Sequence, residues 1–285
     1  MSALLESSEG DEAKMKSSAR AVRDSHQKAF VKIFESLIGR YSRWQVWQDF
    51  VVMAAVTISN LVDKANELER EKTYREIAGK YQGNELKAFS HMLAEVVLGI
   101  EGNPDQDFLG ELYMKLALGN DAAGQVFTPY DLCIAMARLT NGDQLKEQVE
   151  RKGWVAVNDC ACGAGATLLA FANECRRQGI NYQTRVLFVA QDVDYVVGLM
   201  CYLQLSLIGA AGYVVIANTL TNPSTSMDPR GLIPHHSRNV WYTPFYFREE
   251  WHFRRVCAKM DRLFSETVEE DAEYSRQAWN EQQED

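Results

Sequence analysis

Hydrophobic positions in the first 120 residues recur at helical spacing. Between residues 26 and 63 the apolar side chains fall three or four positions apart, and a break at 39–41 divides the pattern, which predicts two helices. Two further helices are predicted at 65–81 and 85–98, before the polar turn GNPDQD. Residues 1–19 contain too few apolar side chains to offset the entropy of ordering, so we expect them to be disordered.

The pattern changes after about residue 122 to short apolar runs that alternate with helical segments. The runs WVAVN, VLFVA and VVIA begin at Trp154, Val186 and Val214, and each ends in a polar loop. Helical spacing follows the first two runs, at 167–177 and 195–208. Strand, turn and helix in this order predict an α/β fold in which a parallel sheet is connected by right-handed crossovers.

Composition supports a globular protein. The chain has 285 residues, of which 46% are hydrophobic and 24% are charged. Its longest apolar run, Phe50–Ile58, is too short to cross a bilayer, and the polar start lacks the apolar middle of a signal peptide. We therefore expect a cytoplasmic protein with no membrane partner, whose six cysteines are free thiols.

The loop after the first run, DCACGAG, combines cysteines, glycines and an aspartate. Cys160 and Cys162 are one residue apart, whereas zinc and redox pairs usually place two residues between their thiols. Gly163 and Gly165 permit a tight turn and a close approach of a ligand to the backbone. The loop lacks the GxGxxG order and the lysine of phosphate-binding loops, so Asp159 is the better guide to the ligand, as an acceptor for a cationic amino group.

The loop after the second run, QDVD, adds an acidic side chain at the next strand tip. Asp192 lies where a carboxylate accepts hydrogen bonds from both hydroxyls of a ribose. Asp194 is equally well explained as the residue that caps the following helix. The two loops together suit an adenosine-bearing ligand without a pyrophosphate, and S-adenosylmethionine is such a ligand.

Five segments in this order resemble a known family. DFLGELYMKLAL begins at Asp107, GQVFTP at Gly124 and DCACGAG at Asp159, and the QDVD loop and NTL follow. The set is similar to the N-6 adenine DNA methyltransferases, specifically the modification subunits of type I restriction systems, and it covers roughly residues 105–222. GQVFTP is its most specific part.

The resemblance implies a Rossmann-like, doubly wound methyltransferase sheet, truncated here, with a helical amino-terminal domain. It also implies S-adenosylmethionine as cofactor. The FTP segment would cover the methionine end, the glycine loop would lie beneath it, Asp192 would hold the ribose, and the NTL loop would lie near the adenine. Cys160 and Asn218 depart from the proline and aspartate that the family commonly has at these positions. The implied cofactor residues are Phe127, Thr128, Pro129, Asp159, Cys162, Gly163, Gly165, Asp192 and Asn218.

One family motif is absent from the sequence. Family enzymes bind the flipped adenine with Asn-Pro-Pro followed by Phe or Tyr, and no such tetrapeptide occurs in this sequence. Flipping a base out of the duplex costs a few kcal/mol of free energy, which the binding pocket must offset by stacking and hydrogen bonds. We therefore consider Asn239, Tyr242 and Phe245 as a substitute wall for the target base, with Asn239 or Tyr242 as its polar partner.

The charge distribution leaves two interpretations of the carboxyl-terminal part. The chain carries a net charge of -9, yet arginines and aromatic residues gather between 230 and 262, and an acidic tail follows. The basic aromatic segment could contact DNA, or it could be the edge of the core followed by a solvated tail. His235, His236, His252 and Cys257 match no zinc spacing, so no metal site is predicted.

Three functions remain open from the sequence. The chain is an adenine DNA methyltransferase, or a non-catalytic regulatory subunit that binds the cofactor and contacts DNA or a partner such as a specificity subunit, or a scaffold with a vestigial pocket. The sheet edge is either extended by VWYTPFYF or closed by another chain in a homo- or hetero-oligomer. The predicted divisions are a disordered start to 19, a helical domain at 20–122, a cofactor domain at 123–223, an aromatic and basic segment at 224–264 and an acidic tail at 265–285.

Overall fold

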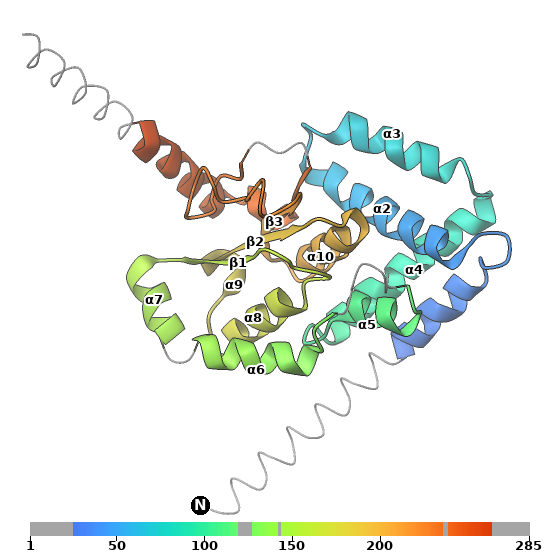
Figure 1. Cartoon of the computed structure of the whole chain (residues 1–285), viewed down its shortest axis with the longest axis horizontal. Helices are drawn as coiled ribbons and strands as arrows, with labels where there is room; N and C mark the ends of the chain where they lie inside the picture. Colours follow the sequence, from blue (N-terminus) through green and yellow to red (C-terminus); the bar gives the residue numbers. More distant parts are fainter. Residues whose placement is uncertain (1–24, 119–126, 142–143, 236–238, 264–285) are drawn as a thin grey trace, which may run out of the picture.

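The computed structural model describes residues 25–118, 127–141, 144–235 and 239–263, and its first part is helical (Figure 1). The helix at 25–35 and α2 (Arg43–Val62) are separated by a turn in which Gly39 has φ 104°, as the break in the pattern predicted. α3 (Glu67–Ala78) and α4 (Gly83–Gly102) confirm the next two predicted helices. The short α5 (Phe108–Lys115) follows, capped by Asp107.

A four-stranded sheet forms the second part. Its strands are β1 (Val155–Asp159), β2 (Val186–Asp192), β3 (Ala211–Ile216) and β4 (Val240–Tyr242), in that spatial order. The first three are parallel, as predicted, whereas β4 is antiparallel to β3, so VWYTPFYF does extend the sheet. The connecting helices are α6 (Tyr130–Asn141), α7 (Gln144–Lys152), α8 (Ala166–Arg177), α9 (Tyr182–Arg185) and α10 (Tyr195–Leu207).

The two faces of the sheet are covered differently. Val186, Phe188 and Ala190 of β2 pack in the core that contains α8 and α10, whereas the alternating Leu187 and Val189 pack beneath the carboxyl-terminal segment. Because β1, β2 and β3 are neighbours in chain order, right-handed crossovers bring both helices to one face. The described strands show no reversal of strand order, so the expected doubly wound arrangement is not confirmed for them.

The helical part and the sheet share one hydrophobic core. α10 is buried on all sides, and it packs against α2 on one side and β3 on the other. Residues from Phe30 through α2, α5 and α10 to Trp241 belong to the same buried cluster. The predicted domain boundary at 122 lies outside the described residues, as do the predicted disordered start and the acidic tail, so these divisions stay predictions.

The two edges of the sheet also differ. At β4 the Arg70 guanidinium donates to the Val240 carbonyl at 2.8 Å and lies 3.9 Å from the Trp241 ring centroid, while a 2.7 Å ion pair with Asp63 holds it in place. β1 forms the opposite edge, and no described strand pairs with its outer side. A side chain thus caps one edge, and the other remains open.

Candidate functional site

Three loops converge at the carboxyl ends of β1, β2 and β3. The Thr219 hydroxyl donates to the Cys160 carbonyl at 2.6 Å, which joins the third loop to the first. The Cys162 N–H donates to the Gln191 carbonyl at 3.0 Å, which joins the first loop to the second strand. We call residues 159–165, 192–194 and 218–220 the carboxyl rim; they meet because the three strands are parallel and in register.

The glycines shape the first loop as the sequence predicted. Gly163 and Gly165 have φ 54° and 97°, the left-handed region that glycine adopts without strain. A Cβ on Gly165 would also lie 2.9 Å from the Cys201 sulfur, so this position requires glycine for packing as well. Gly165 is the N-cap of α8, which directs the amino terminus of that helix toward the loop.

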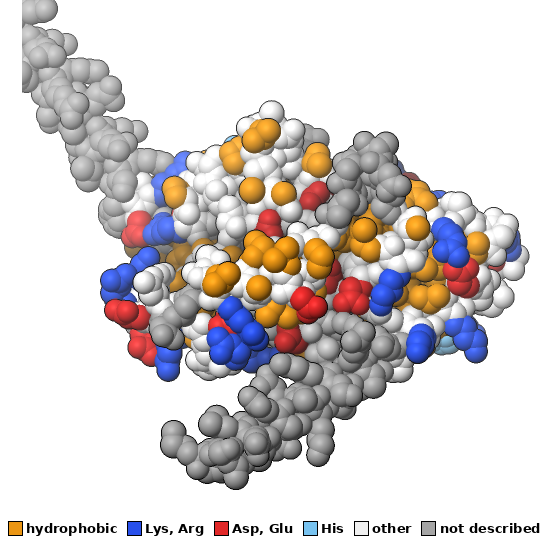
Figure 2. Space-filling view, turned by 60° about the horizontal axis from the view of Figure 1, so that its bottom comes forward, with side chains coloured by type: hydrophobic (Ala, Val, Ile, Leu, Met, Phe, Trp, Pro, Cys, Tyr) orange, Lys and Arg blue, Asp and Glu red, His pale blue; other side chains and the backbone are white. Residues whose placement is uncertain are grey.

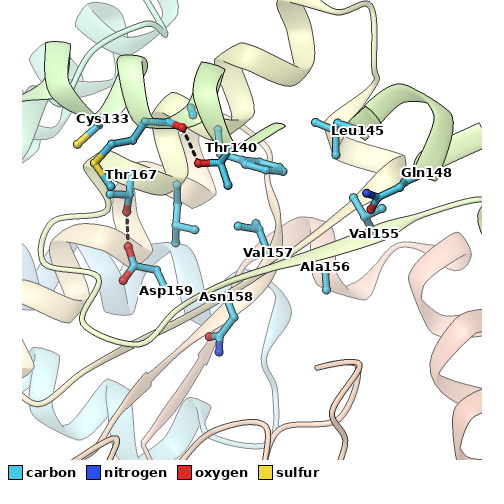
Figure 3. A pocket seen from close by; sticks show the side chains of 14 residues that line it. Cys133, Thr140, Leu145, Gln148, Val155, Ala156, Val157, Asn158, Asp159 and Thr167 are labelled. Atoms are coloured by element: carbon cyan, nitrogen blue, oxygen red, sulfur yellow. Dashed lines mark hydrogen bonds between the residues drawn. The ribbon is translucent and has the colours of Figure 1, made fainter. Parts of the chain in front are cut away.

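Asp159 ends β1 and is half-buried. Its Oδ1 accepts from the Ala161 N–H at 3.1 Å, and its Oδ2 accepts from the Thr167 hydroxyl (Figure 3). Each carboxylate oxygen can accept a second hydrogen bond. The carboxylate is thus held in one orientation and retains acceptor capacity for a cationic group. Thr167 was not recognised from the sequence, since a threonine in the first turn of a helix carries no distinctive signal.

Asp192 is tied directly to the glycine loop. Its Oδ2 accepts from the Gly163 N–H at 2.9 Å and its Oδ1 from the Asp194 N–H, also at 2.9 Å. The two strand tips that the sequence singled out are therefore in contact. Asp194 caps α10 by accepting from the N–H groups of Val196 and Val197, so its structural interpretation is confirmed.

A small cavity of about 90 Å³ lies beside Asp159. The buried carboxylate of Asp107 lines it, where Oδ1 accepts from the Gly110 N–H at 2.9 Å and the Gln204 amide at 2.7 Å. Burial raises the pKa of Asp107 to about 6, against the lowering effect of these two hydrogen bonds. Gln204 also donates to the Ala164 carbonyl at 2.9 Å, which links α5 to the glycine loop through α10. Asp107 received no role from the sequence, although an aspartate before a helical pattern is a capping signal.

The FTP segment lies over the glycine loop. The Phe127 ring is stacked on Tyr113, with centroids 5.2 Å apart, and a Cβ on Gly163 would lie 3.5 Å from it. Thr128 and Pro129 are both exposed, and Thr128 lines the small cavity. The remaining residues of GQVFTP, 124–126, lie outside the described residues.

The outer part of the rim is apolar and exposed. Val193 is 71% exposed and Leu220 is 93% exposed. Between the strand ends, Asn218 is exposed and its side-chain oxygen accepts from the Leu220 N–H at 2.9 Å. Val193 and Leu220 thus stand in solvent beside Asp192 and Asn218, one on each of two neighbouring loops.

The buried cysteine of the loop contributes little chemistry. Cys162 is buried, and a hydrogen bond with Cys201, together with burial, raises the pKa of its thiol well above the usual value. A thiol of this kind is a poor nucleophile and a poor metal ligand. The described residues contain no group of histidine, cysteine and acidic side chains that could hold a metal ion. The glycines and the aspartates therefore define the site.

The structure does not bring together the three residues considered for a target-base wall. The Asn239 carbonyl accepts from the Ile216 N–H, which places Asn239 near the rim. Tyr242 pairs with Tyr213, and the Phe245 ring lies beside Gly209, at the amino end of β3. An antiparallel strand carries successive residues away from the rim, so Tyr242 and Phe245 lie toward its far side.

Most of the basic aromatic segment is packed into the second face of the sheet. Trp251 is fully buried, donates to the Gln183 carbonyl at 2.9 Å and meets Trp154 edge to face. Arg255 lies 3.9 Å from the Tyr246 ring centroid and Arg248 lies 3.7 Å from that of Phe245. We call these residues, with Tyr242 and Arg254, the aromatic face; its rings and guanidinium groups contact one another.

One comparison with known proteins assigns the chain to a family. The family model described as N-6 DNA methylase matches residues 104–279, which is more than half of the chain and includes the whole carboxyl rim. A comparison with curated proteins gives no match. No helix in the described ranges is both long enough and apolar enough to cross a membrane. On the family match, together with the geometry of the rim, the chain belongs to the N-6 DNA methylase family.

Proposed function

We propose that the carboxyl rim binds S-adenosylmethionine, which the N-6 DNA methylase family normally uses. The observation that carries the proposal is the 2.9 Å hydrogen bond from the Gly163 N–H to Asp192, because it joins the two loops that would hold opposite ends of the ligand. When bound, S-adenosylmethionine supplies an electrophilic methyl group.

The small cavity fits the amino-acid end of this ligand. At about 90 Å³ it is too small for a nucleoside, so only the methionine portion would enter it. Asp159 would accept from the ammonium group, and the amino terminus of α8 would face the carboxylate, which helix N–H groups favour. Phe127 would exclude water from one side of the cavity.

The nucleoside would lie across the outer rim. Asp192 retains lone pairs for the two ribose hydroxyls, since each of its oxygens accepts only one described hydrogen bond. Val193 and Leu220 offer exposed apolar surface to the two faces of the adenine ring, and Asn218 offers a polar edge. These side chains suit adenosine, and they form no binding site for a pyrophosphate.

We further propose that the chain acts in DNA modification, as a type I modification-subunit-like protein in the cytoplasm with DNA and a specificity subunit as partners. Methyl transfer to the adenine amino group would need a polar acceptor beside the methyl group. Asn239 is the only member of the considered wall near the rim.

A second candidate function is a non-catalytic subunit that binds the cofactor. The position of Tyr242 and Phe245 toward the amino end of β3 favours this alternative, because no ring of the considered wall is left to stack on a flipped base. An assay for transfer of a labelled methyl group to mixed-sequence DNA distinguishes the enzyme from the binding subunit. Labelled DNA supports the enzyme, and cofactor binding without labelled DNA supports the binding subunit.

Calorimetric titration with S-adenosylhomocysteine, the demethylated product, tests the binding site itself. Asp192→Asn keeps an acceptor for the Gly163 N–H but loses the charge, and we expect its affinity to fall about tenfold or more, since a hydrogen bond to a charged group contributes about 1.5–3 kcal/mol. Asp261→Asn, an exposed acidic residue on the carboxyl-terminal helix, is the matched control. Equal affinity in both variants, or no binding by the parent protein, would reject the proposal.

A further inference from the structure

The outer side of β1 is an unpaired edge with an apolar hollow along it. Val155, Val157 and Asp159 face a cavity of about 460 Å³, while Ala156 and Asn158 point the other way and are exposed (Figure 3). α6, α7 and α8 form the walls of this cavity. An open edge presents unpaired N–H and C=O groups to any extended backbone that approaches it.

Exposed apolar stripes flank the edge on both faces of the sheet. On α6, Leu132, Met136 and Leu139 are exposed at helical spacing, and Leu139 is 87% exposed. Figure 2 turns the side of α6 toward the viewer and shows hydrophobic side chains gathered there. On the other face, the carboxyl-terminal helix (residues 249–263) carries an exposed stripe of Phe253, Val256, Met260 and Leu263. The contact between Trp251 and Trp154 places this helix at the start of β1.

Charge is distributed unequally along the edge. Arg151 and Lys152 end α7, just before the amino end of β1, whereas Asp159 lies at its carboxyl end. α6 also carries opposite charges at its two ends, but here the acidic residue comes first: Asp131 lies in its first turn and Arg138 in its last. An antiparallel copy of the same surface would therefore place basic groups against acidic groups at both ends.

We propose that this surface is a two-fold interface at which β1 pairs with β1 of a second copy of the chain. An isologous contact requires a self-complementary surface, which the strand edge, the two apolar stripes and the opposed charges provide. The pairing continues the sheet to eight strands. Val155 and Val157 of both copies then lie side by side beneath the two α6 helices, where the 460 Å³ hollows receive them. The interface shares Asp159 with the proposed cofactor site, so it is tested on the chain without cofactor.

Sedimentation velocity of the full chain without cofactor, over a range of concentrations, tests the interface. We expect a concentration-dependent dimer. Met136→Glu with Leu139→Lys should raise the dimer dissociation constant about hundredfold or more, because each change is repeated on both copies. Leu68→Lys on α3, also an exposed leucine, should leave it unchanged. A monomer at every concentration, or equal effects of the two variants, would overturn the proposal.

A charge exchange tests the antiparallel arrangement. Asp131→Arg places like charges together and should weaken the dimer, whereas adding Arg138→Asp restores the opposed pair and should recover it. Arg138 also lies 3.9 Å from Glu174 within the chain, so thermal unfolding of Arg138→Asp alone is the folding control. Failure of the double variant to recover would overturn the antiparallel arrangement. A monomer whose β1 amides are nevertheless protected from hydrogen exchange would also overturn it, in favour of a segment of the same chain.

Discussion

The carboxyl rim and the aromatic face both contain residues that suggested a site, but their side chains are used differently. In the rim, Asp159 and Asp192 each accept described hydrogen bonds from their neighbours and keep further lone pairs, and Val193 and Leu220 stand in solvent. In the aromatic face, Tyr246 and Trp251 are buried and the arginines lie over rings. A binding surface keeps hydrogen-bonding capacity and apolar area unused after folding, whereas a core uses both within the protein.

The largest expected effect belongs to the aromatic face. Trp251→Ala should lower the free energy of unfolding by about 3–5 kcal/mol, because it removes a fully buried ring and leaves the Gln183 carbonyl without its donor. Urea denaturation measures the loss. The folded fraction should bind S-adenosylhomocysteine as the parent does, and a loss of affinity larger than the unfolded fraction explains would break the distinction between the two regions.

The small cavity beside the carboxyl rim should contain a group that costs stability. Burial raises the pKa of Asp107 from 3.8 to about 6, so between these values the unfolded chain releases the proton while the native state keeps it, and stability falls until the pH reaches about 6. Asp107→Asn keeps an acceptor for Gly110. The variant should match the parent at acidic pH and become more stable by about 3 kcal/mol above pH 6.

Unfolding free energies of both proteins across this pH range check the prediction. A stability difference that is constant with pH would contradict it, because the effect would then lie in packing and not in the carboxylate.

Gly165→Ala should have an intermediate effect. The new Cβ would lie 2.9 Å from the Cys201 sulfur at φ 97°, so we expect stability to fall by about 2 kcal/mol. The affinity for S-adenosylhomocysteine should also fall, since the amino terminus of α8, which would face the amino-acid end, must shift. Thermal unfolding and calorimetry report the two changes. Gly179→Ala, which also has a positive φ but no atom within 4 Å, is the control for backbone strain alone. Equal effects of both variants would show that packing against Cys201 does not contribute to the loss.

The smallest effect should come from Leu220→Ser. This side chain is exposed without ligand, so stability should not change, while the affinity for adenosine-bearing ligands should fall about fivefold because apolar contact with the base is lost. The same substitution at Leu61, on α2, leaves the affinity unchanged if the rim alone binds the ligand.

Much of the fold followed from periodicity, because the elements it predicted are long or strongly patterned. β2 and α10 are buried on both sides and are continuous apolar runs. The contact between Asp192 and Gly163 could also be expected, since parallel strands bring their carboxyl ends together. A strand signal does not give direction, however. β4 proved antiparallel, and this is why Tyr242 and Phe245 lie away from the rim.

Asp107 and Gln204 could not be assigned from the sequence. They lie 97 residues apart and meet only because α10 packs against α5. A buried glutamine within an apolar helix looks like any other polar residue until its partners are known. An exposed sheet edge was expected, but its location at β1 was not predictable, because the pattern of a strand does not say which neighbours it has.

A crystal structure of the full chain with S-adenosylhomocysteine would show whether the carboxyl rim binds the ligand. We expect density along the carboxyl rim, with the amino-acid end between Asp159 and the start of α8 and the ribose against Asp192. An empty rim with the ligand bound elsewhere, in the hollow along β1 or on the aromatic face, would contradict it.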